Sequence, residues 1–212
     1  MIDLGSIWSL LSKFLTGSQD HDNETSTTIF HSILAVVGAV IRLRRDLVIL
    51  MLPHLGMVLR QLIMSIRGMR SQLGSKQSKV VADTLPKWIN PSCPLSTDEG
   101  KALARLLVTL TTKSIIRSHI PSADTHKAES LARPFSKHAA FVLKAYIGVM
   151  NDPLCVVSLE LRKELQPGLF ALCDMLNEHS RDALMVTLDV GGKATLKSLW
   201  KTYEKQRYVG KG

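Results

Sequence analysis

The chain has 212 residues, of which 45% are hydrophobic, so it is long and apolar enough to fold around its own core, which excludes a disordered tail. Aromatic residues make up only 5%, and this mix favours helix-on-helix packing over an aromatic-rich β-sandwich. The formal net charge of +9 and the pI near 9.6 indicate attraction to polyanions, but charge alone does not separate RNA from DNA, acidic proteins or anionic lipid.

The first part of the chain predicts three helices. Apolar residues at helical spacing predict a helix over Asp3–Leu15, and the polar run Thr16–Thr28 predicts a loop. A second, buried helix is expected over Thr28–Arg44. Asp46 has the character of an N-cap for a third helix, with a kink or a restart at Pro53.

Two stretches of this part have membrane-like composition. Ile33–Ile41 is too short to span a bilayer, and Leu47–Leu59 is interrupted by Pro53 and closely flanked by arginines. We therefore expect buried core helices and no membrane partner. No secretory signal is expected, because the N-terminus includes Asp3 and lacks a basic start before its apolar run.

The middle of the chain combines an irregular region with one strong helix signal. An irregular loop is expected over about residues 68–95, with a short helix around Ser78–Leu85. Ser96 and Glu99 have capping-box spacing, which predicts a helix over Thr97–Ser118. The polar run Pro121–Ser130 predicts a further loop.

Proline and glycine divide the remainder into further helices. The expected segments are a helix opening at Pro134 and ending at Asn151-Asp152-Pro153, one from Pro153 through Glu164, one from Pro167 to about Leu176, one over Arg181–Leu188 capped by Ser180 and closed by Gly191-Gly192, and a last helix over Lys193–Arg207. No β-alternation of useful length appears. The fold class is therefore all-α, either an irregular HEAT- or armadillo-like solenoid or a helical bundle, in one domain over residues 1–212.

No constellation predicts catalysis, a cofactor, a metal or a small-molecule substrate. The histidines are scattered, and Cys93, Cys155 and Cys173 have no metal or redox spacing, so we expect reduced thiols, with Cys155 and Cys173 in the core. The acids Glu160, Glu164 and Asp174 beside Arg162 and Lys163 are explained by solvated helix faces. The run 191–195 does not complete a phosphate loop, because Thr187 and Ala194 stand at required positions.

The terminal helix carries the candidate contact surface. Leu196, Leu199, Trp200 and Tyr203 form an apolar arc, and a neighbouring basic stripe comprises Lys193, Lys197, Lys201 and Lys205. Two interpretations stay open: the lysines are merely solvated on a docking helix, or they contact RNA phosphate or an acidic partner. Further candidate contacts are Arg207, Tyr208, Lys211, Arg42, Arg44 and Arg45. Charge without a base-reading motif argues against sequence-specific recognition.

Three segments carry a resemblance to a known family. They are Leu131-Ala132-Arg133-Pro134-Phe135-Ser136-Lys137-His138, the run 161–173 around Leu165-Gln166-Pro167-Gly168-Leu169-Phe170, and the ending from Leu199 to Gly212. In this order they resemble the C-terminal domain of the nucleolar pre-ribosomal-RNA processing family known as unhealthy ribosome biogenesis protein two, or nucleolar preribosomal-associated protein two.

That resemblance implies a helical, non-catalytic scaffold in the nucleus and nucleolus. It implies a role in assembly of the large ribosomal subunit and processing of its pre-rRNA, together with other assembly factors. Family members are much longer, so the chain is expected to be either a fragment with the last domain or a stand-alone relative. The alternative function is a helical adaptor that binds proteins without a direct RNA role.

Overall fold

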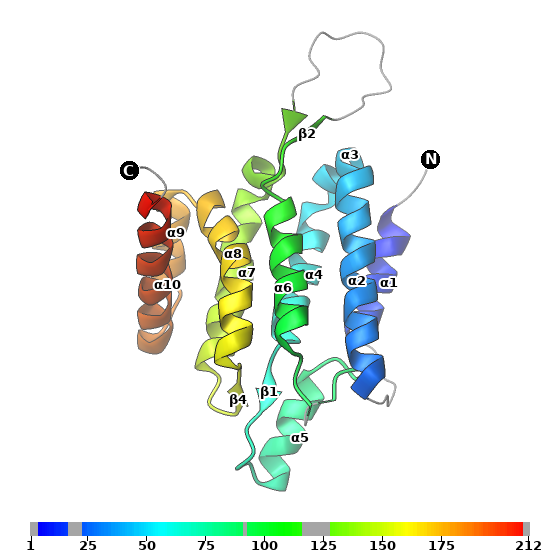
Figure 1. Ribbon diagram of the computed structural model, residues 1–212, viewed down its shortest axis with the longest axis vertical. Helices are drawn as coiled ribbons and strands as arrows, with labels where there is room; N and C mark the ends of the chain where they lie inside the picture. The colour runs from blue at the N-terminus through cyan, green and yellow to red at the C-terminus, as the bar shows by residue number, and fades with distance from the viewer. Residues whose placement is uncertain (1–3, 17–22, 91–92, 116–127, 210–212) are drawn as a thin grey trace.

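The computed structural model describes residues 4–16, 23–90, 93–115 and 128–209, and these are almost entirely helical (Figure 1). In chain order the elements are α1 (Leu4–Thr16), α2 (Asn23–Leu43), α3 (Arg45–Val48), the 3-10 turn η1 (Ile49–Met51), α4 (Leu52–Met64), β1 (Gly68–Met69), α5 (Ser75–Thr84), α6 (Thr97–Thr109), β2 (Ser114–Ile115), β3 (Ala128–Glu129), α7 (Ala132–Asn151), β4 (Cys155–Val156), α8 (Leu159–Met175), α9 (Glu178–Val186) and α10 (Val190–Val209). The predicted all-helical class is confirmed.

The long helices lie in two layers. One layer holds α2, α6, α8 and α10 side by side, and the other holds α1, α4, α7 and α9 (Figure 1). His31 contacts Glu99, and Gly38 lies beside Leu106 further along both helices, so α2 and α6 run in the same direction. This arrangement is that of stacked helical pairs. Assignment to the HEAT or armadillo repeat type stays a prediction, as does the single-domain boundary 1–212.

The contact between α6 and α8 is unusually close because glycines stand on both helices. A Cβ at Gly168 would lie 2.7 Å from the Ala104 Cα and 3.0 Å from a Leu107 methyl carbon. A Cβ at Gly100 would lie 3.0 Å from the Leu161 Cγ. Since Leu107 and Leu161 are almost fully buried, the two helices meet in the core, and their contact leaves no space for a side chain at either glycine.

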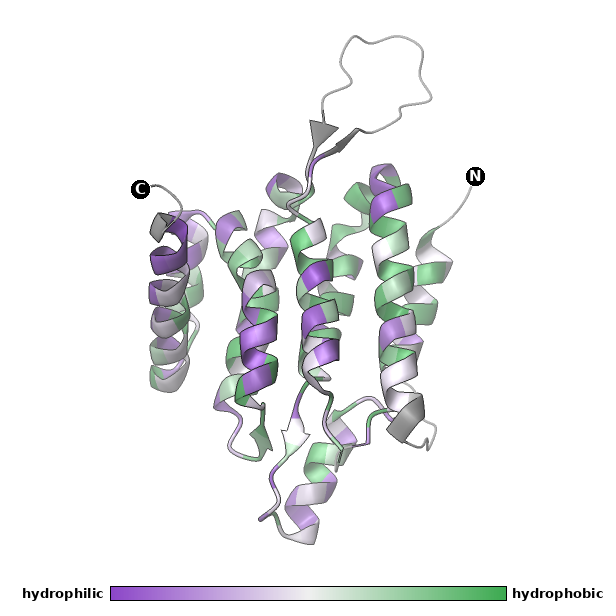
Figure 2. Cartoon of the chain, viewed as in Figure 1, coloured by the Kyte–Doolittle hydropathy of each residue, from purple (hydrophilic) through white to green (hydrophobic). Residues whose placement is uncertain are grey.

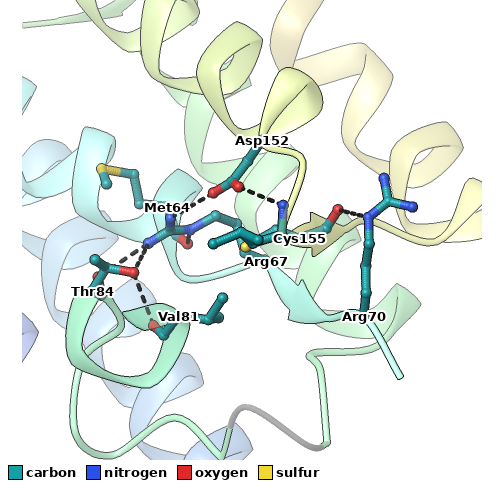
Figure 3. A network of polar contacts seen from close by, with 8 residues as sticks. Met64, Arg67, Arg70, Val81, Thr84, Asp152 and Cys155 are labelled. Atoms are coloured by element: carbon teal, nitrogen blue, oxygen red, sulfur yellow. Dashed lines mark hydrogen bonds and ion pairs between the residues drawn. The ribbon is translucent and has the colours of Figure 1, made fainter. Parts of the chain in front are cut away.

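A buried arginine joins three segments that lie far apart in the sequence (Figure 3). The Arg67 guanidinium donates to the Met64 carbonyl at 2.9 Å, to the Thr84 carbonyl at 3.0 Å and to the Asp152 carboxylate at 3.3 Å. Asp152 also accepts from the Leu154 amide at 2.9 Å. The ends of α4, α5 and α7 are therefore held at one point by a charge whose hydrogen bonds are largely satisfied.

Short strands extend this junction, and sequence alternation gave no sign of them. Strand β1 pairs antiparallel with β4, and the Arg70 Nε donates to the Cys155 carbonyl at 3.1 Å (Figure 3). Strand β2 pairs with β3, and β2 lies at the other end of the long helices from β1 and β4 (Figure 1). Two-residue strands are too short to show a period of two, so propensity cannot reveal them.

Several predicted boundaries in the first half are wrong. Helix α2 begins at Asn23, inside the predicted loop 16–28, and residues 17–22 lie outside the described part of the chain. Asp46 does not cap a helix, because α3 already begins at Arg45, and its carboxylate pairs with Arg44 at 3.1 Å. The restart at Pro53 is confirmed: α4 begins at Leu52 with the proline in its first turn.

The capping box that opens α6 is confirmed. The Ser96 hydroxyl accepts from the Asp98 amide, and the Glu99 carboxylate accepts from the Ser96 amide at 2.7 Å. Burial raises the pKa of Glu99, but the hydrogen bonds from Ser96 and His31 outweigh it and lower the pKa below its usual value. The helix ends at Thr109 rather than Ser118, and residues 116–127, which include most of the predicted loop 121–130, are not described.

The irregular region over 68–95 contains more structure than predicted. Helix α5 spans Ser75–Thr84, so it begins before the expected Ser78. Trp88 packs near Phe30, with ring centres 6.3 Å apart, and its carbonyl accepts from the Ser26 hydroxyl. This segment therefore covers the start of α2 instead of forming a detached loop.

The break predicted at Pro167 is wrong. Helix α8 runs without interruption from Leu159 to Met175, with Pro167 inside it and exposed. Leu165 and Leu169 on either side are fully buried, so packing of the helix offsets the backbone hydrogen bond that proline cannot donate. The cap predicted at Ser180 is also displaced: Asn177 precedes α9 and accepts from the Ser180 amide at 2.7 Å.

Two helical stretches, Ser26–Leu43 and Arg45–Met64, have the length and composition to cross a membrane, with 44% of each buried inside the structure. A core helix of a water-soluble protein passes the same test, so the finding is weak evidence for insertion. Phe30, Ile41 and Leu59 from these stretches lie in the common core. In Figure 2, α2 carries more green than the helix next to it, α6, and the outer faces of α6 and α8 carry more purple.

The expectation for the cysteines is confirmed by burial. Cys155 and Cys173 are buried, and Cys93 is exposed; all three are free thiols. Burial raises the pKa of Cys155 to about 11 and that of Cys173 to about 12, with smaller contributions from Asp152 and Asp174. Both buried thiols are therefore protonated near neutral pH and serve as small apolar residues.

The close contact of α6 and α8 makes a testable prediction. Gly168→Ala should lower the free energy of unfolding by about 1–3 kcal/mol, because the new methyl group meets the Ala104 backbone. Gly148→Ala is the matched control, since a Cβ there has no atom within 4 Å on the exposed side of α7. It should stabilise the helix by about 0.5–1 kcal/mol. Equal effects of the two substitutions in urea unfolding would contradict the close contact.

Candidate nucleic-acid interface

The terminal helix begins earlier than predicted because an aspartate caps it. The Asp189 carboxylate accepts from the Gly192 amide at 2.7 Å, and its backbone carbonyl accepts from the Lys193 amide at 2.9 Å. Gly191 and Gly192 therefore lie in the first turn of α10 instead of closing the preceding helix. A Cβ at Gly191 would lie 2.9 Å from the Asn151 Oδ1, so glycine also allows α10 to approach the end of α7.

An apolar arc docks α10 against α7 and α8. Leu196, Leu199 and Tyr203 are buried, and the Tyr203 ring lies 5.8 Å from that of Phe170 on α8. The Tyr203 hydroxyl donates to the Asp174 carboxylate at 2.5 Å. Burial, followed by the effect of Asp174, raises the pKa of Tyr203 to about 12. Asp174 is therefore part of the docking contact and not only a solvated surface acid.

The predicted lysine stripe begins next to this arc, where Lys197 and Lys201 line the groove between α9 and α10, and continues onto the outer side of the helix. Each four-residue step turns the helix by about 40° beyond a full turn, so the stripe winds slowly across one face. Lys197, Lys201 and Lys205 are exposed, and Lys193 at the start of the stripe is half-buried. The three exposed ammonium groups can approach a polyanion without moving the apolar arc.

The remaining candidates near the C-terminus differ from the lysines. Arg207 is exposed, but one guanidinium nitrogen donates to the Tyr203 hydroxyl at 3.2 Å, and the group lies 5.9 Å from the Tyr203 ring centre. It thus extends the contact with Asp174. The side chain of Tyr208 and all of Lys211 lie outside the described residues.

The second basic group is not brought to α10. Helices α2 and α3, which hold Arg42 and Arg45, lie at the opposite end of the row from α10 (Figure 1). Arg42 is exposed, and Arg44 pairs with Asp46. Arg45 is only 5% exposed and donates to the Thr112 carbonyl at 2.8 Å. Its predicted role as a contact is wrong, because its guanidinium is occupied inside the protein.

Two grooves flank the lysine stripe, and the sequence interpretation found neither. Between α9 and α10 the Trp200 ring is half-buried, with the Arg181 guanidinium 5.4 Å from its centre and Glu204 accepting from its Nε1 at 3.0 Å. On the other side, a groove between α7, α8 and α10 is lined by Arg162, a residue for which the sequence predicted no role. Sequence spacing predicts which residues share one face of a helix. It does not predict which helices pack against each other, and the grooves form between packed helices.

Metal ligands do not cluster in the part of the chain that the structure describes: no group of three or more His, Cys, Asp or Glu side chains is placed to hold an ion. The described basic surface can act through charge, hydrogen bonding and apolar contact.

The Tyr203 contact predicts how stability depends on pH. The pKa of about 12 in the folded protein exceeds the ordinary value of 10.0, so the unfolded chain loses this proton first as pH rises. The free energy of unfolding should therefore fall between about pH 10 and 12, and Tyr203→Phe should make this fall shallower. At neutral pH the substitution should cost about 0.5–1.5 kcal/mol through the lost hydrogen bond. Denaturant unfolding across pH checks both; an unchanged pH profile in the variant would refute the contact.

Comparison with known proteins supports an assignment for the whole chain. Residues 1–211 match the family model described as Urb2/Npa2 family. No curated protein and no solved structure matches the chain. The resemblance inferred from the C-terminal segments is thereby confirmed and extends across the first helices as well. The chain belongs to the Urb2/Npa2 family, which implies a role in ribosome biogenesis.

Proposed function

We propose that the chain is a non-catalytic scaffold in assembly of the large ribosomal subunit and processing of its pre-rRNA. In this role it contacts other large-subunit assembly factors and, through phosphate groups, pre-rRNA in the nucleolus. The observation that carries the proposal is the family match over residues 1–211. The basic surface of α10 adds a physical means of contact with RNA.

The architecture suits a scaffold. A row of paired helices exposes long faces on both layers, and such faces serve as extended binding surfaces in helical-repeat proteins. The helices also position side chains rigidly, because each long helix buries one face in the common core. Partners bound at opposite ends of the row would then be held at a fixed separation.

The RNA half of the proposal rests on the lysine stripe. Lys197, Lys201 and Lys205 are exposed, and the net charge of +9 attracts polyanions over a longer range. Ammonium groups on successive helical turns match a phosphate backbone without reading bases. Recognition would therefore depend on the shape and charge of the RNA.

The alternative is an adaptor that binds only proteins, with the lysines serving solubility. The distribution of positive charge favours it in one respect, because Arg44 is paired, Arg45 is buried, and α2, which holds Arg42, lies at the other end of the row from α10. A single narrow stripe gives weaker RNA binding than a continuous basic face. Direct measurement of salt-dependent binding separates the two functions.

That measurement uses the full chain and a triple variant, Lys197→Gln, Lys201→Gln and Lys205→Gln. The logarithm of affinity for a single-stranded oligonucleotide should fall with the logarithm of salt concentration, and the triple variant should reduce this slope by roughly 2, at about 0.7 per phosphate. The matched control is Lys76→Gln, Lys79→Gln and Lys87→Gln, which removes the same charge from exposed positions in and after α5. Identical slopes for the two triple variants would favour the protein-only adaptor.

The scaffold role is tested in cells by purifying the tagged chain and identifying the RNA and proteins that accompany it. We expect precursor RNA of the large subunit together with its assembly factors. The lysine variant of α10 should retain the proteins and lose a larger share of RNA than the α5 variant. Recovery of neither precursor RNA nor assembly factors with a folded chain would overturn the proposal.

A further inference from the structure

The groove between α7, α8 and α10 combines a basic side with an apolar side. It encloses about 420 Å³ beside the docking contact of the terminal helix. Arg162 and Lys163 line it from α8, and Ser198 lines it from α10. Its apolar side includes Leu159 and Leu199. No aspartate or glutamate is among the described residues that line it, although Lys163 also lines a neighbouring groove with Asp98, Glu160 and Glu164. Arg162 is therefore the basic residue on which the charge of this groove mainly depends.

Arg162 is the residue of this groove whose guanidinium lacks a hydrogen-bond partner at one nitrogen within the described structure. This nitrogen, Nε, is shielded from solvent, and the side chain as a whole is half-buried, so a ligand can approach only the accessible end of the guanidinium. A guanidinium has five N–H donors and no acceptor, so a ligand that binds its accessible terminal nitrogens must supply the acceptor. A carboxylate or phosphate is the strongest such acceptor, because both partners are then charged.

The apolar side decides between these two anions. Leu159 is 51% exposed in the first turn of α8, and Met150 beside it is half-buried. The one aromatic ring in the groove, that of Tyr146, is only 7% exposed. A nucleic acid would therefore find phosphate contacts but no open ring on which to stack a base. An acidic residue next to a large apolar residue satisfies both sides of the groove.

We propose that the groove between α7, α8 and α10 binds a protein segment in which Asp or Glu stands beside Leu, Ile or Met. The carboxylate accepts from the Arg162 guanidinium, with Lys163 adding attraction, and the apolar side chain covers Leu159. This inference deepens the proposed scaffold role, because it specifies the chemistry of a protein partner. The lysine stripe borders this groove on α10, so the proposed protein and RNA surfaces adjoin, and they differ in the residues that form them.

The test measures fluorescence anisotropy of a labelled helical peptide composed of Glu, Leu and Ala against the full chain. Arg162→Gln should weaken binding about tenfold or more, because a charge-assisted hydrogen bond is lost. Arg60→Gln is the matched control: it removes the same charge from an exposed position on α4 outside the groove, and it should leave affinity unchanged. No binding by the wild-type chain, or equal losses in both variants, would overturn the inference.

A second variant tests the same groove if the Arg162→Gln protein does not fold. Ser198→Glu places a carboxylate on α10 at the edge of the same groove. It should abolish peptide binding and raise the melting temperature, since the new carboxylate supplies Arg162 with an internal partner. Peptide affinity equal to that of the wild-type chain would contradict the inference.

An oligouridine of the same net charge distinguishes phosphate from carboxylate. Its affinity should be unaffected by Arg162→Gln and reduced by the α10 lysine variant. If Arg162→Gln instead weakens oligouridine and not the peptide, the groove holds phosphate and the proposal is wrong. The two proposals can be tested separately. If the tagged chain co-purifies with pre-ribosomal particles but does not bind the peptide, only the proposal about the groove is wrong.

Discussion

The close contact between α6 and α8 is the constraint on which the rest of the structure depends. Gly168 lies against the Ala104 backbone in the centre of the core, so the spacing of the two helices is fixed by backbone and not by flexible side chains. The same packing keeps α8 continuous through Pro167. A break there would have redirected its second half, which supplies Phe170 and Asp174 to the terminal helix.

The position of α8 then determines which face of α10 is free. Phe170 and Asp174 receive Tyr203, and this contact turns the apolar arc inward. The exposed lysines must consequently point outward, and Arg162 must lie at the seam between the two helices. One helix thus creates both a basic outer face and a groove with an unpartnered guanidinium Nε. These surfaces differ in chemistry, which suits a scaffold that holds RNA and protein at once.

Local signals predicted most helices, whereas features that depend on distant contacts were missed. The capping box at Ser96 acts within four residues and was correct. Gly191 and Gly192 in the first turn of α10 were misinterpreted because glycine occurs at both ends of helices, and the cap formed by Asp189 shows that here they begin one. Arg45 was misplaced on a solvated surface because its partner, Thr112, lies on a segment 67 residues away. Helical periodicity was enough to predict the lysine stripe. The direction in which the lysines point could not be predicted, because it depends on the contact of Tyr203 with Phe170 and Asp174 on α8.

The central claim is that α10, docked by Tyr203, presents the surface that contacts pre-ribosomal RNA. The most direct measurement is cross-linking of the chain to RNA in purified pre-ribosomal particles, with the cross-linked residues mapped by mass spectrometry. The account predicts cross-links concentrated at Lys197, Lys201 and Lys205. Cross-links confined to α5 or to the region around Arg42, with none on α10, would contradict it.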